Sequence, residues 1–112
     1  MTKTKLNFFG IPCSNLKHLL KGDELPCTSE QEAFSIAFGA SLTGASSTVY
    51  MQNTGFATCI NVIISLFKTY EVPYPHLIIS NRTKPIYHSN VAIYLYHFLA
   101  LLKYDNVEVI QE

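Results

Sequence analysis

Short apolar runs alternate along the chain with longer segments in which apolar residues recur at helical spacing. Such short runs, with few polar positions, are typical of strands that are buried on both faces of a parallel sheet. The candidate strands are Leu6 to Phe9, the very short Glu24 to Cys27, Ser47 to Met51, His76 to Ile79 and Val107 to Ile110.

The segments between these strands predict helices. The expected helices are Asn15 to Leu20, Ala33 to Leu42, Ile60 to about Tyr70, and Asn90 to Lys103. Ser14, Thr28 or Ser29, and Ser89 are placed to cap helix starts, and Ser29 with Glu32 fits a capping box. The alternation of strand and helix predicts an α/β fold, a three-layer parallel sheet with helices on both faces. We expect residues 1–112 to form a single domain, because a chain of 112 residues can bury one core but not two.

In a parallel sheet of this kind, ligands bind in the loops that follow the carboxyl ends of the strands. Those loops are residues 10–14, 27–30, 52–55 and 80–89. Candidate functional residues are therefore expected in these segments.

Glu30 has two open interpretations. A carboxylate in the first turn of a helix is favoured by the helix dipole and needs no further role. Glu30 also precedes a nearly apolar helix, and a carboxyl group held against apolar walls is suited to proton exchange. The segment Asn53-Thr54-Gly55 is likewise either a plain strand-to-helix turn or a place where backbone approaches a ligand closely.

Cys13, Ser14 and His88 are weaker candidates. Ser14 fits a helix cap better than a nucleophile, because no histidine and acid partners are recognisable for it. His88 is expected in a loop at the ligand end, where a solvated surface histidine is the ordinary case and a proton donor is the alternative.

Composition narrows the classes of partner. Charged residues make up 14% of the chain and the formal net charge is +0, so nucleic acid and anionic membranes are poor partners. No apolar stretch predicts a membrane span or a signal peptide. The 3 cysteines have no CxxC pair, which argues against zinc and favours free thiols in the cytoplasm. The low charge indicates either that the chain is deeply globular or that part of its surface is covered by a partner.

Several segments carry a resemblance to a known family. They are FFGIPCSNLKHLL, SEQEAFSIAFGASL, VYMQNTGFATCIN and HLIISNR, in this order. The chain resembles the pyrimidine-binding (Pyr) domain of thiamine-diphosphate-dependent decarboxylases. It is most like sulfopyruvate decarboxylase alpha subunits and the N-terminal half of phosphonopyruvate decarboxylases. MQN, the Thr-Gly pair and the later Asn61 form the most specific part.

The resemblance implies roles for particular residues. Glu30 matches the glutamate that hydrogen-bonds the aminopyrimidine ring and helps to form the reactive ylid of the cofactor. Gln52, Asn53, Thr54 and Gly55 match the turn that lines the pyrimidine pocket. Cys13, Ser14 and His88 match positions that face the substrate, and Arg82 or Lys84 could bind its anionic group. The implied activity is decarboxylation of a 2-oxo acid of the phosphonopyruvate or sulfopyruvate class.

The chain also departs from the family. Thr58 replaces a usual glycine, and Arg82-Thr83 replaces an Arg-Gly pair. No segment resembles the Gly-Asp-Gly…Asn signature that binds magnesium and the diphosphate. The resemblance therefore implies an oligomer in which thiamine diphosphate is shared with a diphosphate-binding (PP) subunit or a homologous chain, and in which the partner holds Mg²⁺. The alternative is a truncated, non-catalytic Pyr fold that acts only as an interaction module.

Overall fold

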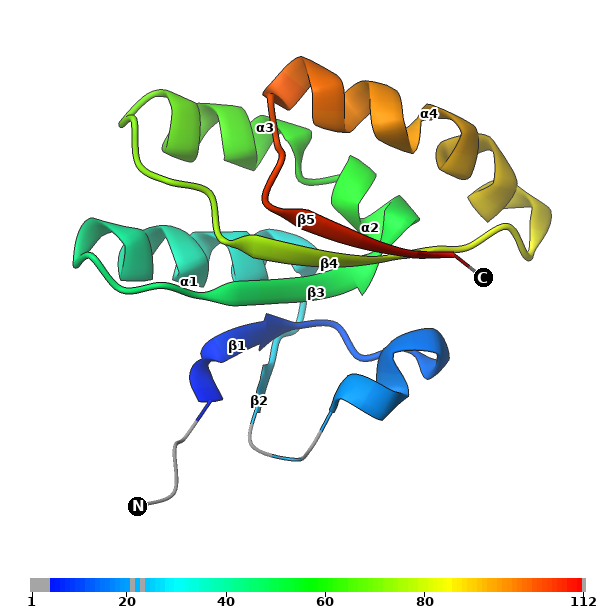
Figure 1. The fold of residues 1–112 in the computed structure, drawn as a ribbon, viewed down its shortest axis with the longest axis horizontal. Coiled ribbons are helices and arrows are strands. Elements are labelled where there is room, and N and C mark those ends of the chain that lie inside the picture. Colours follow the sequence, from blue (N-terminus) through cyan, green and yellow to red (C-terminus); the bar gives the residue numbers. More distant parts are fainter. Residues whose placement is uncertain (1–4, 21, 23, 112) are drawn as a thin grey trace.

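A computed structural model describes residues 5–20, 22 and 24–111 of the chain. Its centre is a parallel sheet with the strand order β2-β1-β3-β4-β5 (Figure 1). The strands are β1 (Lys5–Gly10), β2 (Glu24–Pro26), β3 (Thr48–Gln52), β4 (His76–Asn81) and β5 (Val107–Gln111). The predicted α/β class and the predicted strands are confirmed.

Helices connect the strands. They are the 3-10 helix η1 (Ser14–Leu19), α1 (Glu30–Leu42), α2 (Asn53–Ala57), α3 (Ile60–Val62) with its continuation η2 (Ile63–Lys68), and α4 (Ile86–Leu102). The hydroxyl of Ser29 accepts a hydrogen bond from the Glu32 N–H at 3.1 Å, and the Glu32 carboxylate accepts one from the Thr28 N–H at 2.7 Å. This arrangement confirms the predicted cap of α1.

The two faces of the sheet are covered unequally. Because side chains alternate along a strand, Val49 packs in the core under the α helices, while its neighbour Tyr50 faces Leu16 of η1. The connection after β1 runs to one side of that strand, and the later connections run to the other. Right-handed crossovers then place η1 on one face and α1, α2 and α4 on the opposite face. Among the described residues, η1 is the only helix that covers its face of the sheet.

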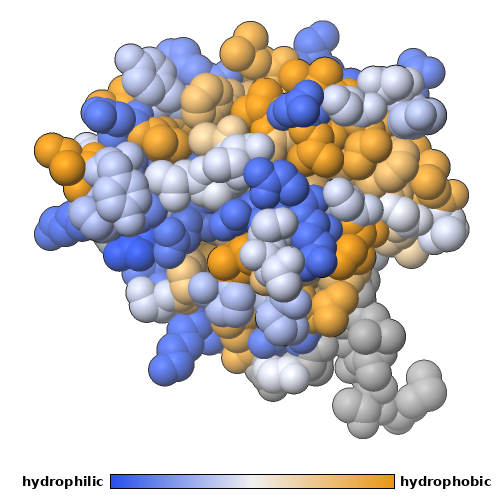
Figure 2. All heavy atoms as spheres, turned by 180° about the vertical axis from the view of Figure 1, so that it is seen from behind, coloured by the Kyte–Doolittle hydropathy of each residue, from blue (hydrophilic) through white to orange (hydrophobic). Residues whose placement is uncertain are grey.

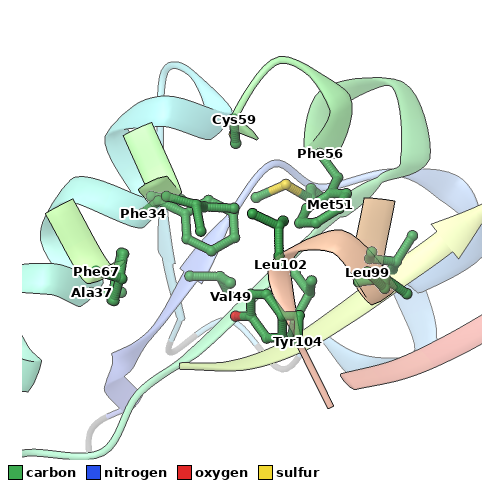
Figure 3. Close-up of a cluster of buried hydrophobic side chains, with 14 of the residues drawn as sticks. Phe34, Ala37, Val49, Met51, Phe56, Cys59, Phe67, Leu99, Leu102 and Tyr104 are labelled. Atoms are coloured by element: carbon green, nitrogen blue, oxygen red, sulfur yellow. The ribbon is translucent and has the colours of Figure 1, made fainter. Parts of the chain in front are cut away.

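The main core lies between the sheet and the α helices (Figure 3). The rings of Phe34 and Phe56 lie 6.3 Å apart between centroids, and Phe34 also meets Phe67 edge-on at 6.2 Å. Tyr104 stacks on Tyr74 at 4.2 Å and donates a hydrogen bond to the Pro75 carbonyl at 2.6 Å. This aromatic core holds α1, α2 and η2 against β3 and so fixes the relative positions of their first turns.

The structure corrects several details of the prediction. The last helix begins at Ile86 rather than Asn90, because Pro85 and not Ser89 is its N-cap. Asn53 to Gly55 is the first turn of α2 rather than a loop. The predicted helix from Ile60 continues through η2, whose turns are wider than those of an α-helix. The first predicted helix is the tighter η1.

The nearly apolar sequence of α1 predicts a helix that is buried on most sides, and the structure shows this only in part. Ala33, Phe34 and Ala37 are fully buried, but Leu42 at its end is 60% exposed. No helix among residues 5–20, 22 and 24–111 is long and apolar enough to cross a bilayer.

Candidate functional site

The strand order reverses between β1 and β3, which lie side by side in the sheet. The connections from these two strands therefore diverge at their carboxyl ends, and in open α/β sheets this is where ligands bind. The loop before α1 reaches the same edge, because the Cys27 N–H donates a hydrogen bond to the Gly10 carbonyl at 2.8 Å. The starts of α1 and α2 both meet here.

Glu30 and Gly55 are in direct contact at this edge. A Cβ atom placed on Gly55 would lie 2.5 Å from Cγ and 2.5 Å from Oε2 of Glu30. Gly55 is buried and Glu30 is half-buried. Because any larger residue at position 55 would occupy this space, the glycine is what lets the glutamate side chain rest on the first turn of α2.

Asn53 ties this turn to the next loop. Its amide nitrogen donates to the Arg82 carbonyl at 3.0 Å and to the His88 carbonyl at 3.1 Å, and its amide oxygen accepts from the Arg82 N–H at 3.3 Å. The side chain is fully buried. Asn53 therefore positions the segment between β4 and α4, and both of its amide protons are used inside the protein.

Gln52 and Thr54 flank that residue. Gln52 ends β3 opposite Ser80 of β4, and both Gln52 and Thr54 are half-buried. They are the members of the predicted turn whose side chains remain partly accessible, so a ligand at this edge would meet them together with Glu30 and the backbone at Gly55.

Two residues that the sequence analysis did not identify support this contact. The Gln31 side chain donates to the Thr58 carbonyl at 3.2 Å, and the Cys59 thiol donates to the Gly55 carbonyl at 3.4 Å. Burial raises the pKa of Cys59 to about 12, with the negative charge of Glu30 as a smaller contribution. The thiol therefore stays neutral and acts as a buried packing group. Cys59 lies four residues after Gly55, a spacing at which two residues of one helix are neighbours. The predicted helix begins only at the next residue, so this spacing does not indicate the contact.

Cys13 and Ser14 lie elsewhere at the sheet edge. They begin η1, on the face opposite α1, where Asn15 donates to the Ser80 hydroxyl at 3.0 Å. A shallow hollow there is lined by Pro12, Cys13, Ser14, Lys17 and Leu20. The structure does not join this hollow to the Glu30–Gly55 contact, and the predicted substrate-facing role of these residues stays a prediction.

His88 is placed differently from the expectation. It lies in the first turn of α4 and is 3% exposed, so it is not a solvated loop histidine. The earlier start of α4, with Pro85 as its N-cap, explains this, because it places His88 within the helix on the side that is buried in the protein. Arg82 is half-buried and Lys84 exposed in the segment that Asn53 fixes. No group of three or more His, Cys, Asp or Glu side chains that could hold a metal ion is found within the described ranges.

Comparison with known proteins gives relatives that share one printed description. The chain is 47% identical over 79 residues to the "Sulfopyruvate decarboxylase subunit alpha" of Methanocaldococcus jannaschii, covering 64% of this chain and 46% of that protein. The proteins of the same name from Methanothermobacter thermautotrophicus and Methanococcus maripaludis are 34% and 39% identical over 79 residues, covering 64% of this chain and 47% of each relative.

The chain spans about half the length of the curated relatives it matches. No model of a protein family matches it. The sequence is thus similar to alpha subunits of a decarboxylase. The structure has an α/β sheet in which an acid and a glycine are in contact at the switch in strand order.

Proposed function

We propose that this chain supplies the pyrimidine-binding half of a thiamine diphosphate site in a decarboxylase of 2-oxo acids, with sulfopyruvate as its substrate class. The observation that carries the proposal is the contact between Glu30 and Gly55 at the switch point of the sheet. The similarity to sulfopyruvate decarboxylase alpha subunits supports it from the sequence.

The residues at this edge fit one end of such a cofactor. Glu30 offers a half-buried carboxylate beside a glycine, where a flat heteroaromatic ring could approach the backbone of α2. A carboxyl group in that position can hold or release a proton at a ring nitrogen. Thiamine diphosphate, when bound, supplies the electron sink that decarboxylation of a 2-oxo acid requires.

The residues around Glu30 restrict its movement. Gln31 links the first turn of α1 to the Thr58 carbonyl, and Ser29 caps the same turn. Phe34, one turn further along α1, is fully buried against Phe56. The backbone of Glu30 is therefore held on rigid elements, which fixes the point from which its side chain reaches a bound ring.

The other end of the cofactor needs ligands that the described residues do not bring together. A diphosphate with its magnesium ion calls for oxygen ligands that carry charge, and the described residues contain no group of three or more candidate ligands. We propose that a second subunit, carrying a diphosphate-binding domain, supplies these ligands and completes the site. The description of the relatives as alpha subunits supports a partner subunit.

Calorimetry tests this division of the site. The chain, a candidate diphosphate-binding subunit and a mixture of both are each titrated with thiamine diphosphate in the presence of Mg²⁺. We expect tight binding in the mixture alone, and decarboxylation of sulfopyruvate by the same mixture. Tight binding by the isolated chain, or no binding with any partner co-purified from the native host, would contradict the proposal, and the second result would favour a non-catalytic interaction module.

The same mixture separates the two candidate substrates. Sulfopyruvate and phosphonopyruvate differ in the charge and geometry of the anionic group. Faster turnover of sulfopyruvate is expected from the likeness to the relatives. A preference for phosphonopyruvate would keep the cofactor site and reject the substrate class.

A further inference from the structure

The helix α4 has an unusual outer surface. Between Ile86 and Leu102 the sequence contains no Asp, Glu, Lys or Arg. Its inner side is buried in the molecule through His88, Leu95, Leu99 and Leu102. Its opposite side carries large apolar side chains that are exposed by between 52% and 82%, and we name this set the α4 outer face. These residues are Ile86, Tyr87, Ile93, Tyr94, Tyr96 and Leu101.

The α4 outer face concentrates most of the exposed apolar groups of the molecule. Outside it, the large apolar side chains exposed in the described part of the chain are Leu25, Leu42, Ile64 and Tyr70. Figure 2 shows hydrophobic residues over the upper part of the molecule as seen from behind, interrupted by polar ones. A surface rich in tyrosine and without charge has the composition of an interface core.

The exposed area is large enough for a stable dimer. If one large side chain buries about 200 Å² in full, the α4 outer face exposes on the order of 800 Å². A standard interface buries about 800 Å² on each partner. The α4 outer face, including its flanks at Tyr87 and Tyr96, therefore exposes an area of the size that specific association between two proteins uses.

We propose that the α4 outer face binds the same face of a second copy of this chain, with the two helices antiparallel about a two-fold axis. In such an interface, if residue i contacts residue j, then j also contacts i. Setting Ile93 opposite Tyr94 of the second copy places Ile86 opposite Leu101. The same register places Asn90 opposite His97.

That register is self-complementary. Ile86, Ile93, Tyr94 and Leu101 meet apolar partners, while the exposed Asn90 amide and His97 imidazole, which lie among them on α4, meet each other and can hydrogen-bond. No charge on α4 opposes a charge on the second copy. The absence of Lys and Arg from α4 also leaves nothing on this face to attract nucleic acid or anionic lipid, which would need a basic surface.

The proposal does not depend on the proposed cofactor. The Glu30–Gly55 contact lies at the carboxyl edge of the sheet, where α1 and α2 begin, whereas the α4 outer face lies on the side of α4 opposite its buried residues. Tyr96, at the margin of that face, accepts a hydrogen bond from Gln111 of β5 at 3.2 Å. Self-association can therefore be measured on the isolated chain without cofactor or partner subunit, and its failure leaves the function proposed above untouched.

Sedimentation equilibrium of the isolated chain tests the proposal. We expect a species of twice the 12.6 kDa chain mass at micromolar concentration. Ile93→Lys is expected to weaken this association at least about 30-fold, because it places a charge near the two-fold axis. Leu42→Lys is the matched control, since Leu42 is 60% and Ile93 63% exposed and both lie on helices. Circular dichroism checks that each variant stays folded.

Disulfide cross-linking tests the register. Positions 86 and 101 lie about 22 Å apart along one helix, so in the antiparallel dimer each faces the other position and not its own copy. The double variant Ile86→Cys with Leu101→Cys should form a covalent dimer on mild oxidation, and each single variant should not. A monomer at all concentrations, dimers unaffected by Ile93→Lys, or equal cross-linking in the single variants would overturn the proposal.

Discussion

The side chain of Glu30 rests on Gly55 so closely that a Cβ atom at position 55 would lie 2.5 Å from the glutamate carboxylate. The two residues are far apart in the sequence and come from different helices, α1 and α2. Their contact brings the acid and the first turn of α2 together at the switch point of the sheet.

Replacing Gly55 by alanine should displace the Glu30 side chain while leaving the fold intact. The clash is with a flexible side chain that can swing towards solvent, so we expect the free energy of unfolding to change by no more than about 1 kcal/mol. Decarboxylation by the reconstituted complex should fall by at least about tenfold, since a misplaced group loses its orientation. Thermal unfolding and turnover measure the two effects.

Gly39→Ala is the control for that variant. A Cβ atom at Gly39 meets nothing within 4 Å, and the residue lies within α1. Alanine should therefore stabilise the chain by about 0.5 to 1 kcal/mol and leave turnover unchanged. Equal turnover in Gly55→Ala and Gly39→Ala would show that the position of Glu30 does not matter.

Asn53→Ala should destabilise the protein strongly. The variant removes three hydrogen bonds, two that join α2 to Arg82 after β4 and one that joins it to His88 in the first turn of α4, in a place that is fully buried. We expect a loss of about 2 to 3 kcal/mol in urea unfolding. Asn61→Ala serves for comparison, because Asn61 is exposed and accepts one bond from Ser65, and its effect should stay within about 0.5 kcal/mol. Similar losses in both would refute the positioning role.

Stability should fall in alkaline solution. Burial raises the pKa of Cys59 from 9.0 to about 12, and burial together with the charges of Glu24 and Cys27 raises the pKa of Tyr50 from 10.0 to about 12. Above pH 9 the unfolded chain therefore releases protons that the folded chain still holds, so the free energy of unfolding decreases as the pH rises towards 12. Urea midpoints between pH 8 and pH 11 measure this decrease.

The Cys59→Ala variant isolates one contribution to that decrease. Its stability is lower at neutral pH because it leaves a cavity, but the slope of its unfolding free energy against pH should be shallower than that of the unchanged chain. Identical slopes would mean that the buried thiol is not the group responsible.

The sheet could be predicted from the sequence, because each strand is a local run of apolar residues bounded by turn signals. The strands β1 and β4 lie where the sequence placed them, and Ser29 caps α1 as its spacing with Glu32 indicated. The start of α4 was wrong because both Pro85 and Ser89 are good starting residues, and only packing distinguishes them.

The site could be predicted only in part. Glu30 and Gly55 were identified through a resemblance, but their contact depends on the packing of Phe34 against Phe56, which no local pattern reveals. The inward position of His88 and the occupied amide of Asn53 likewise follow from tertiary structure. Interactions between residues distant in sequence were beyond the reach of motif and periodicity.

The decarboxylation rate of Glu30→Gln in the complex with the diphosphate-binding subunit tests whether the Glu30 carboxyl group moves a proton at the proposed site. Glutamine keeps the size of the side chain and removes its ability to exchange a proton, so turnover should fall by about 10² to 10⁴-fold with an unchanged melting temperature. Glu32→Gln, two residues further along α1, keeps the capping interaction and should retain full turnover. Full turnover by Glu30→Gln would contradict the account.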